Sequence, residues 1–379
     1  MKASFLKKIT FFAFLLASAT ISFGQNAILS KNAKVSVLTC GAGNESYSLF
    51  GHTAIRITDS EHFIDLVYNY GAFDFNTPNF VAKFIKGNLQ YFAVAHSFSD
   101  FINEYNYDKR SVYEQELNIP INLKQKLFDN LNSSLAFGES HYTYKFIDKN
   151  CTSMVVEIIN KSLDTVAVVK NTDTSITYRT ILYPYFNHHF YEKLGTSIFF
   201  GKKVDQMGTK IFLPLELHRS LKKVKFNNEL LAKENKTLLV FNETHPSSWW
   251  NNCYSYLLLL GAIVIVNRKL INQLYLLMMG LLGLFFLAIG FYSSHQELGY
   301  NYNILLFNPA MLLLLYFYYV KNKKWTYALS LFNLVVLLIY LLILINKAHL
   351  FIVLPLILAN GIILVRLVIE NKKRIGVGI

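Results

Sequence analysis

Residues 47–57 read YSLFGHTAIRI, and residues 148–157 read DKNCTSMVVE. In the first stretch a glycine is followed by alternating β-branched and apolar residues, which is typical of a buried strand beginning at His52. The second stretch places Cys151 at the point where a loop becomes a helix, with helical periodicity over residues 152–162. We therefore expect a histidine at the start of a strand and a cysteine at the start of a helix.

The segments around these two stretches predict a mixed α+β domain. Apolar patterns rich in β-branched and aromatic residues predict strands over 34–39, 52–57, 63–70, 89–95 and 111–117. Helical periodicity predicts helices over 78–85, 99–107, 123–135 and 152–162, with Ser99 and Thr152 as helix starts. The pattern from 174 to 231 is mainly helical, with breaks at Pro184 and Pro214. We expect an α+β domain over residues 25–165 and a mainly helical extension over 166–248.

The first 24 residues have the pattern of a secretory signal peptide. Residues 2–8 carry three lysines, residues 9–19 form an apolar run, and small and polar residues follow up to Gly24. An N-terminal membrane anchor is the alternative, but the apolar run is shorter than the roughly 20 residues that a span needs. We expect cleavage before Gln25 and export of the chain that follows.

The composition after Trp249 is that of a membrane domain. Five apolar segments approach the length of a membrane span: 250–266, 274–292, 305–320, 325–345 and 350–369. Basic clusters at 268–269, 321–324 and 372–374 alternate with the connections 293–303 and 346–349, which carry little or no lysine and arginine. By the positive-inside rule the basic clusters are cytoplasmic, so everything before Trp249 is periplasmic. We predict a bundle of about five transmembrane helices over 249–379 in a bacterial inner membrane.

The charge and the cysteines exclude several classes of protein. The net charge of +13 lies largely in short clusters between apolar segments, which indicates membrane topology and not binding of nucleic acid. Three cysteines, Cys40, Cys151 and Cys253, are too few for a disulfide framework, although a Cys40–Cys151 bridge in an oxidising periplasm stays an alternative. The sequence has no metal-ligand spacing, phosphate loop or nucleotide fingerprint, so we predict no cofactor.

Cys151 is the candidate nucleophile, and His52 is the candidate base. A thiol at a helix N-terminus lies at the positive end of the helix dipole and near free backbone N–H groups, which lower its pKa and can hold an oxyanion. A nearby histidine would serve as general base and then as general acid. The structural alternative is a buried apolar cysteine and a hydrogen-bonded histidine, and spacing alone favours it. Cys40, which precedes no helix, is the second candidate nucleophile, and Cys253 is assigned no chemistry.

The order of these motifs resembles a known fold. A Gly-His-x-Ala strand followed later by Asn-Cys-Thr is similar to the circularly permuted branch of the NlpC-type papain-like fold, which includes lecithin:retinol acyltransferase and in which the histidine comes first. The phrases at 67–75, 87–91, 110–112 and 142–146 lie between the two motifs. Together they resemble the Lnb-type N-terminal periplasmic domain family over most of 36–162, and 201–205 and 212–214 are similar to its downstream part.

The resemblance implies a role for each candidate residue. Cys151 would be the nucleophile that accepts an acyl group, and His52 would be its base. Asn69, in its Tyr-Asn-Tyr-Gly setting, or Asp65 would orient the imidazole, and we favour Asn69. Tyr47 and Tyr144 are candidate donors to the acyl oxyanion, with aromatic packing as the alternative.

The resemblance also implies an activity, which is N-acylation of bacterial lipoproteins with an acyl group from a phospholipid or a lipoprotein glyceride. A papain-like peptidase or amidase acting on cell-wall peptide is the second hypothesis, and a non-catalytic periplasmic sensor or scaffold is the third. Polar residues of the loop 293–303, among them His295 and Asn301, would line a lipid site or be solvated. Asn308 is expected at membrane depth, where an unpaired amide is costly.

Overall fold

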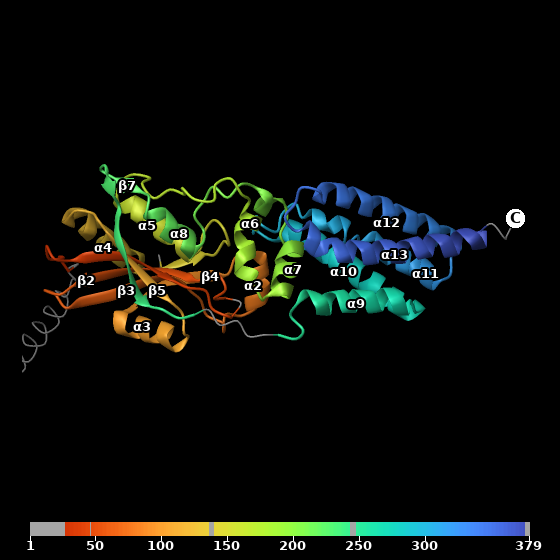
Figure 1. Ribbon diagram of the computed structural model, residues 1–379, viewed down its shortest axis with the longest axis horizontal. Coiled ribbons are helices and arrows are strands. Elements are labelled where there is room, and N and C mark those ends of the chain that lie inside the picture. Colours follow the sequence, from red (N-terminus) through yellow and green to blue (C-terminus); the bar gives the residue numbers. More distant parts are fainter. Residues whose placement is uncertain (1–26, 46, 136–139, 243–247, 376–379) are drawn as a thin grey trace, which may run out of the picture.

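The computed structural model describes residues 27–45, 47–135, 140–242 and 248–375, and the expected signal peptide lies outside them. Figure 1 shows a sheet-containing domain at one end of the long axis and a bundle of long helices at the other. The mixed α+β class with a C-terminal helical region is therefore confirmed.

The N-terminal domain is built on a seven-stranded antiparallel sheet in the order β6-β4-β3-β2-β1-β5-β9. Its strands are β1 Lys34–Cys40, β2 His52–Asp59, β3 Ile64–Ala72, β4 Gln90–Ser97, β5 Val112–Leu117, β6 His141–Thr143 and β9 Ala232–Leu239. Each of the five predicted strands is present, and each lies within a few residues of its predicted bounds. β6 has three residues and β9 is largely polar, so neither carries a clear apolar period.

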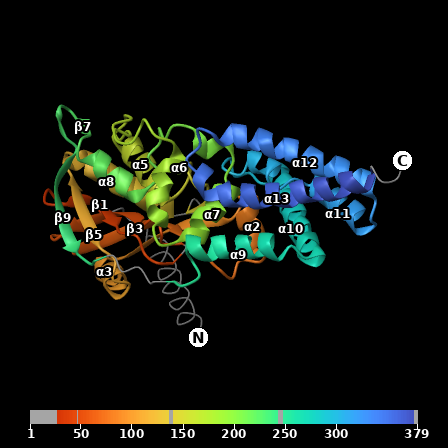
Figure 2. The same cartoon turned by 45° about the vertical axis from the view of Figure 1, so that its right-hand side comes forward.

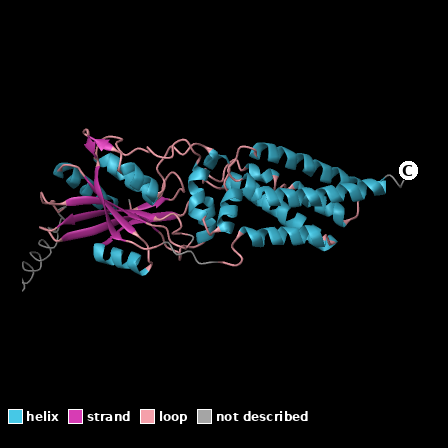
Figure 3. Ribbon diagram, in the orientation of Figure 1, coloured by secondary structure: helices cyan, strands magenta, loops and turns pink. Residues whose placement is uncertain are grey.

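Helices cover both faces of this sheet (Figure 3). The helices up to residue 165 are α2 Phe80–Lys86, α3 Phe98–Tyr107, α4 Ile121–Leu135 and α5 Cys151–Ser162, and α2 lies at the end of the domain that faces the bundle. α4 and α5 pack on the face that carries Ile55 and Tyr68, while α3 packs on the face that carries Ala54 and Val67. The alternation of inward residues along β2 and β3 thus buries one residue set on each side of the sheet.

Helices α3 and α5 begin one residue before the predicted starts Ser99 and Thr152, and their N-caps lie one residue earlier still. The N-cap of α3 is Ser97, whose side chain accepts a hydrogen bond from the backbone N–H of Asp100. The N-cap of α5 is Asn150, whose side chain accepts from the backbone N–H of Ser153. In both cases the capping residue satisfies a helix N–H that has no partner within the helix.

The chain after residue 166 begins as expected and then changes. Short helices come first: α6 Tyr178–Leu182, η1 Tyr183–Phe186, α7 Phe190–Phe199, η2 Lys202–Asp205 and α8 Pro214–Leu221. Three strands that were not predicted follow, namely β7 Lys225–Phe226, β8 Glu229–Leu230 and β9. Because β9 pairs with β5, the sheet is completed by residues far beyond 165.

The C-terminal region is a helical bundle (Figure 2). Its elements are α9 Cys253–Val266, α10 Lys269–Tyr292, η3 Tyr302–Leu305, α11 Ala310–Tyr319, α12 Lys323–Leu344 and α13 Leu350–Ile375. Four segments of the described chain are long and apolar enough to cross a membrane, and α9 is a shorter apolar helix of 14 residues. These five helices match the five predicted segments.

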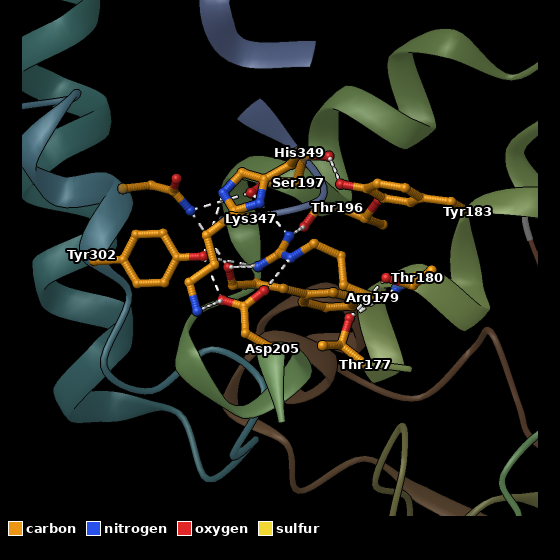
Figure 4. Close-up of polar contacts among 12 residues, drawn as sticks. Thr177, Arg179, Thr180, Tyr183, Thr196, Ser197, Asp205, Tyr302, Lys347 and His349 are labelled. Carbon is orange, nitrogen blue, oxygen red and sulfur yellow. Dashed lines mark hydrogen bonds and ion pairs between the residues drawn. The ribbon is translucent and has the colours of Figure 1, made fainter. Parts of the chain in front are cut away.

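A buried polar cluster joins the extension to the bundle (Figure 4). The Arg179 guanidinium on α6 donates to Asp205 Oδ1 at 2.7 Å and to the carbonyl oxygens of Ser197 and Phe200 at the end of α7. Tyr302, at the start of a membrane segment, donates to the other oxygen of Asp205 at 2.5 Å. One buried ion pair thus connects three short elements of the periplasmic part to the bundle.

Candidate active site

The start of β2 depends on the glycine before it. Gly51 has a φ of +80°, and a Cβ at this position would lie 2.4 Å from the carbonyl oxygen of Cys40. A side chain is therefore excluded both by backbone conformation and by space. The turn leads directly into His52, which pairs with Cys40 as the first residue of the strand.

The start of α5 is fixed by Asn150. Besides capping the helix, its side-chain amide donates to the carbonyl oxygens of Phe146 at 2.7 Å and Phe212 at 2.9 Å. The hydroxyl of Thr152 is 3.0 Å from that of Thr53 on β2, and both residues are fully buried. The residue after Cys151 is therefore bonded to the residue after His52, which holds the helix start against the strand.

The structure brings His52, Cys151 and Asn69 together. His52 Nε2 lies 3.1 Å from Asn69 Oδ1, which leaves Nδ1 for the Cys151 thiol. Asn69 lies on β3, opposite Ala54 of β2. An amide oxygen that accepts from Nε2 holds the imidazole in one orientation, with Nδ1 able to take a proton from sulfur.

The pKa values of the two groups move in opposite directions. Burial by itself would raise the pKa of Cys151, but the charge and hydrogen bond of His52, together with the Thr53 N–H and the Thr152 hydroxyl, lower it. Burial would lower the pKa of His52, but the charge and hydrogen bond of Cys151 and the bond to Asn69 raise it. Both shifts are in the direction of thiolate and imidazolium, and the thiolate is the form in which cysteine is a nucleophile.

A second glycine lies beside the two side chains. Gly71, near the end of β3, has a φ of +118°. A Cβ built on it would be 3.6 Å from Cys151 Cβ and 3.8 Å from His52 Cε1. The strand therefore passes directly beside the pair.

Cys151 and His52 line an apolar cavity of about 430 Å³. Most of its wall is aromatic, and the aromatic residues are Tyr47, Phe50, Phe73, Phe75, Phe80, Phe84, Tyr91, Tyr144, Phe146 and Phe212. Of the other lining residues, Leu213 and Pro214 extend the apolar wall. A cavity of this kind accommodates a hydrocarbon chain or another apolar group beside the sulfur.

Comparison with protein families assigns both parts of the chain. Residues 20–183 match the model of the Lnb N-terminal periplasmic domain, and residues 252–374 match the Lnb transmembrane domain. The chain belongs to the Lnb family. It is a multi-pass membrane protein with a periplasmic N-terminal domain, as the signal and charge patterns predicted. No curated protein and no solved structure matches it.

The other residues singled out from the sequence lie elsewhere in this Lnb-family chain. The carboxylate of Asp65 accepts two hydrogen bonds from Arg56, at 2.8 and 2.9 Å, and is not bonded to His52. Cys40 is fully buried, and burial raises its pKa to about 12. Both Cys40 and Cys151 are free thiols, so the alternative of a bridge between them is wrong. Cys253 is an exposed free thiol at the start of α9.

The two candidate tyrosines line the cavity in different ways. Tyr47 is exposed at its edge. Tyr144 is stacked on Tyr91 with 4.4 Å between ring centroids, and burial raises its pKa well above the ordinary value. Tyr144 therefore packs as an aromatic wall residue.

In the loop 293–303, His295 and Asn301 are not simply solvated, because both are bonded to the periplasmic domain. His295 is buried, with Nε2 2.9 Å from the carbonyl oxygen of Phe84. Glu297 is buried and accepts from the backbone N–H of Ile147 at 3.1 Å. Asn301 donates to the carbonyl oxygens of Ile198 and Phe199. The loop is thus a contact between the bundle and the periplasmic domain, close to the segment that leads into Cys151.

Asn308 supports the start of a helix. The side chain of Asn308 accepts from the backbone N–H of Ala310 at 3.0 Å and so supports the start of α11. Within the residues that the structure describes, no three His, Cys, Asp or Glu side chains are grouped to hold a metal ion.

Sequence reasoning missed the residues that hold the helix start. Asn150 was quoted in the motif but was not recognised as a cap, although its Asn-x-x-Ser pattern with Ser153 is a capping signal. The pairing of Thr53 with Thr152 joins residues 99 positions apart and leaves no local pattern.

Proposed function

We propose that this protein is a periplasmic cysteine acyltransferase that N-acylates bacterial lipoproteins through a thioester on Cys151. The observation that carries the proposal is the half-buried Cys151–His52–Asn69 arrangement beside an aromatic cavity. A thiolate beside an imidazolium supplies a nucleophile and a proton donor, and an apolar cavity suits a fatty acyl chain.

The first half-reaction loads the cysteine. The Cys151 thiolate attacks the ester carbonyl carbon of a phospholipid, and a C–S bond forms. Asn150 already occupies the Ser153 N–H, so the oxyanion is stabilised by the preceding N–H groups of α5, those of Cys151 and Thr152. The ester C–O bond then breaks, His52 gives its proton to the leaving glycerol oxygen, and a lysophospholipid departs.

The second half-reaction transfers the acyl group. The α-amine of a lipoprotein's N-terminal residue attacks the thioester carbonyl, and His52 Nδ1 takes a proton from the amine nitrogen. A C–N amide bond forms as the C–S bond breaks, which returns the thiolate and imidazolium. Asn69 stays bonded to Nε2 in both steps and keeps Nδ1 directed at the reacting atoms.

A papain-like peptidase or amidase would use the same three residues, so the cavity and the membrane region distinguish the two hypotheses. A cell-wall peptide is polar, whereas the cavity beside Cys151 has an aromatic wall. A peptidase also needs no bundle of membrane helices, whereas a lipid donor is concentrated at the bilayer. A non-catalytic scaffold would have no use for a lowered thiol pKa beside a histidine.

The test is complementation of a bacterial strain that lacks lipoprotein N-acylation, read by mass spectrometry of a lipoprotein N-terminal peptide. The parent protein should restore the third acyl chain, and Cys151→Ser and His52→Ala should not. Asp65→Asn serves as a control, because Asp65 is not bonded to His52. An acyl group on Cys151 that hydroxylamine removes would identify the thioester. Release of peptide from purified cell wall without lipoprotein acylation would favour the hydrolase instead.

A further inference from the structure

The α2 segment, defined as residues 75–86, lies directly against the end of a membrane span. Ser293 Oγ donates to the carbonyl oxygen of Ile85 at 2.6 Å, and the Ser294 N–H donates to that of Lys86 at 2.8 Å. These serines immediately follow Tyr292, the last residue of the span α10. Figure 1 shows α2 at the end of the periplasmic domain that faces the bundle. The last turn of α2 is therefore at the level where the chain leaves the membrane.

The α2 segment exposes three large apolar side chains. Val81 is 67% exposed, and Phe75 and Phe84 are also exposed. Next to it, α10 exposes Phe291 and Tyr292, which face lipid because they end a membrane span. The apolar surface of the α2 segment is thus continuous with a surface that already contacts the bilayer.

The charge of α2 matches the surface of a bilayer. Its sequence, FVAKFIK, carries two lysines and no acidic residue. The Lys86 ammonium lies 5.0 Å from the centre of the Tyr292 ring, beside the aromatic end of the span. Lysines at this level meet lipid phosphates, while the aromatic rings occupy the region of the headgroups.

The same helix forms one wall of the cavity that contains Cys151. Phe80 and Phe84, one helical turn apart, both line it. Phe80 contacts Phe73 and Phe75 with ring centroids 5.8 and 5.2 Å apart, and Phe84 stacks on Tyr144 at 6.5 Å. Aromatic side chains therefore extend from the bilayer level to the thiol without a polar break in the helix wall.

We propose that the α2 segment rests in the periplasmic leaflet, with Val81 and Phe84 among the acyl chains and Lys83 and Lys86 at lipid phosphates. A phospholipid then passes one acyl chain along Phe84 and Phe80 to Cys151 without leaving the bilayer. The membrane placement stands on the contacts of α2 alone, whereas the passage of an acyl chain rests on the proposed function.

The placement is tested by spin labelling of the full chain in lipid nanodiscs of phosphatidylethanolamine and phosphatidylglycerol. Val81→Cys is labelled in a Cys151→Ser, Cys253→Ser background, with Phe75→Cys as a second site. Phe63→Cys is the matched control, since Phe63 is 96% exposed in the β2–β3 turn, at the opposite end of these strands from His52. Labels at 81 and 75 should be relaxed by oxygen and protected from a water-soluble nickel chelate, and the label at 63 should show the reverse. Equal exposure of all three labels to the chelate would overturn the placement.

The passage of the acyl chain is tested with Val81→Asp and Phe63→Asp. Val81 does not line the cavity, so its substitution should leave acylation of Cys151 by water-soluble p-nitrophenyl butyrate unchanged. With a phospholipid donor in vesicles, Val81→Asp should raise KM about tenfold or more, and Phe63→Asp should not. Equal loss with both donors would mean that α2 acts on the reacting groups and would overturn the passage. If neither ester acylates Cys151 in the parent protein, the proposed function is overturned. The labelling would still decide where α2 lies.

Discussion

Replacing His52 by alanine should raise the pKa of Cys151 and slow its alkylation. In the native site burial favours the neutral thiol, and the His52 charge is the largest influence that opposes burial. Cys40 shows what burial does when no imidazole is near, since its pKa is raised to about 12. In His52→Ala only the Thr53 N–H and the Thr152 hydroxyl are left, so the pKa of Cys151 should move from below to above its ordinary value of 9.0.

The size of the effect follows from the titration. Each unit of pKa is a factor of ten in the thiolate fraction at neutral pH, equivalent to about 1.4 kcal/mol. A change that crosses the ordinary value of the thiol should therefore reduce the rate of alkylation at neutral pH about tenfold or more. Asn69→Ala should give a smaller reduction, because it removes the bond that orients the imidazole and leaves its charge in place.

The assay is the rate of carbamidomethylation of Cys151, measured by mass spectrometry from neutral to alkaline pH in a Cys253→Ser background. The midpoint of the pH curve matters more than the rate, because a smaller side chain also widens access to the sulfur. His96→Ala is the matched control, since His96 is an exposed histidine on β4. Identical midpoints for His52→Ala and the parent protein would refute the coupling of the two groups.

Three further predictions concern pH, the helix start and the junction. Acylation of Cys151 should give a bell-shaped pH profile. Thiolate appears as pH rises through the lowered pKa of Cys151, and imidazolium is lost as pH rises through the raised pKa of His52. Asn69→Ala removes a bond that raises the pKa of His52, so it should move the alkaline limb to lower pH. Asn150→Ala should destabilise the protein by about 2–4 kcal/mol, since it removes a cap and leaves two carbonyl oxygens without their donor, whereas the exposed Asn106→Ala should change thermal stability by less than about 0.5 kcal/mol. Arg179→Met should lower the stability of the detergent-solubilised protein by about 3–5 kcal/mol, because the Asp205 carboxylate stays buried without the Arg179 guanidinium. Equal melting temperatures for Arg179→Met and the exposed Arg219→Met would contradict this reasoning.

The parts of the fold that could be predicted from the sequence are those with a strong local period. β2 and β3 alternate between two apolar cores, and α10 and α12 are long and apolar, so each appears in the pattern within a few residues. β9 could not be predicted, because an edge strand with sequence AKENKTLL needs only backbone pairing to β5. The sequence left a lipid site and a solvated loop as alternatives for 293–303, since the hydrogen-bond partners of this loop, such as Ile147 and Phe84, are far away in sequence.

The candidate site was predictable in its residues but not in its geometry. Gly-His and Asn-Cys-Thr mark a strand start and a helix start, and the resemblance to the Lnb type selected Cys151, His52 and Asn69. Sequence alone left Asp65 as an alternative to Asn69, and the contact of Asn69 with His52 and the pairing of Asp65 with Arg56 separate the two. The catalytic roles of the three residues stay a prediction that the experiments above decide.

The position of β9 has a consequence for the order of export. The chain is exported from its N-terminus, and the sheet receives its last strand at residues 232–239, shortly before the first membrane helix begins at Cys253. Until that strand arrives, β5 presents an unpaired backbone edge to the periplasm, where a neighbouring chain or a chaperone can pair with it. The sheet of the periplasmic domain can therefore be completed only after residues 232–239 have been translocated. The helices that follow then hold the completed sheet at the bilayer surface.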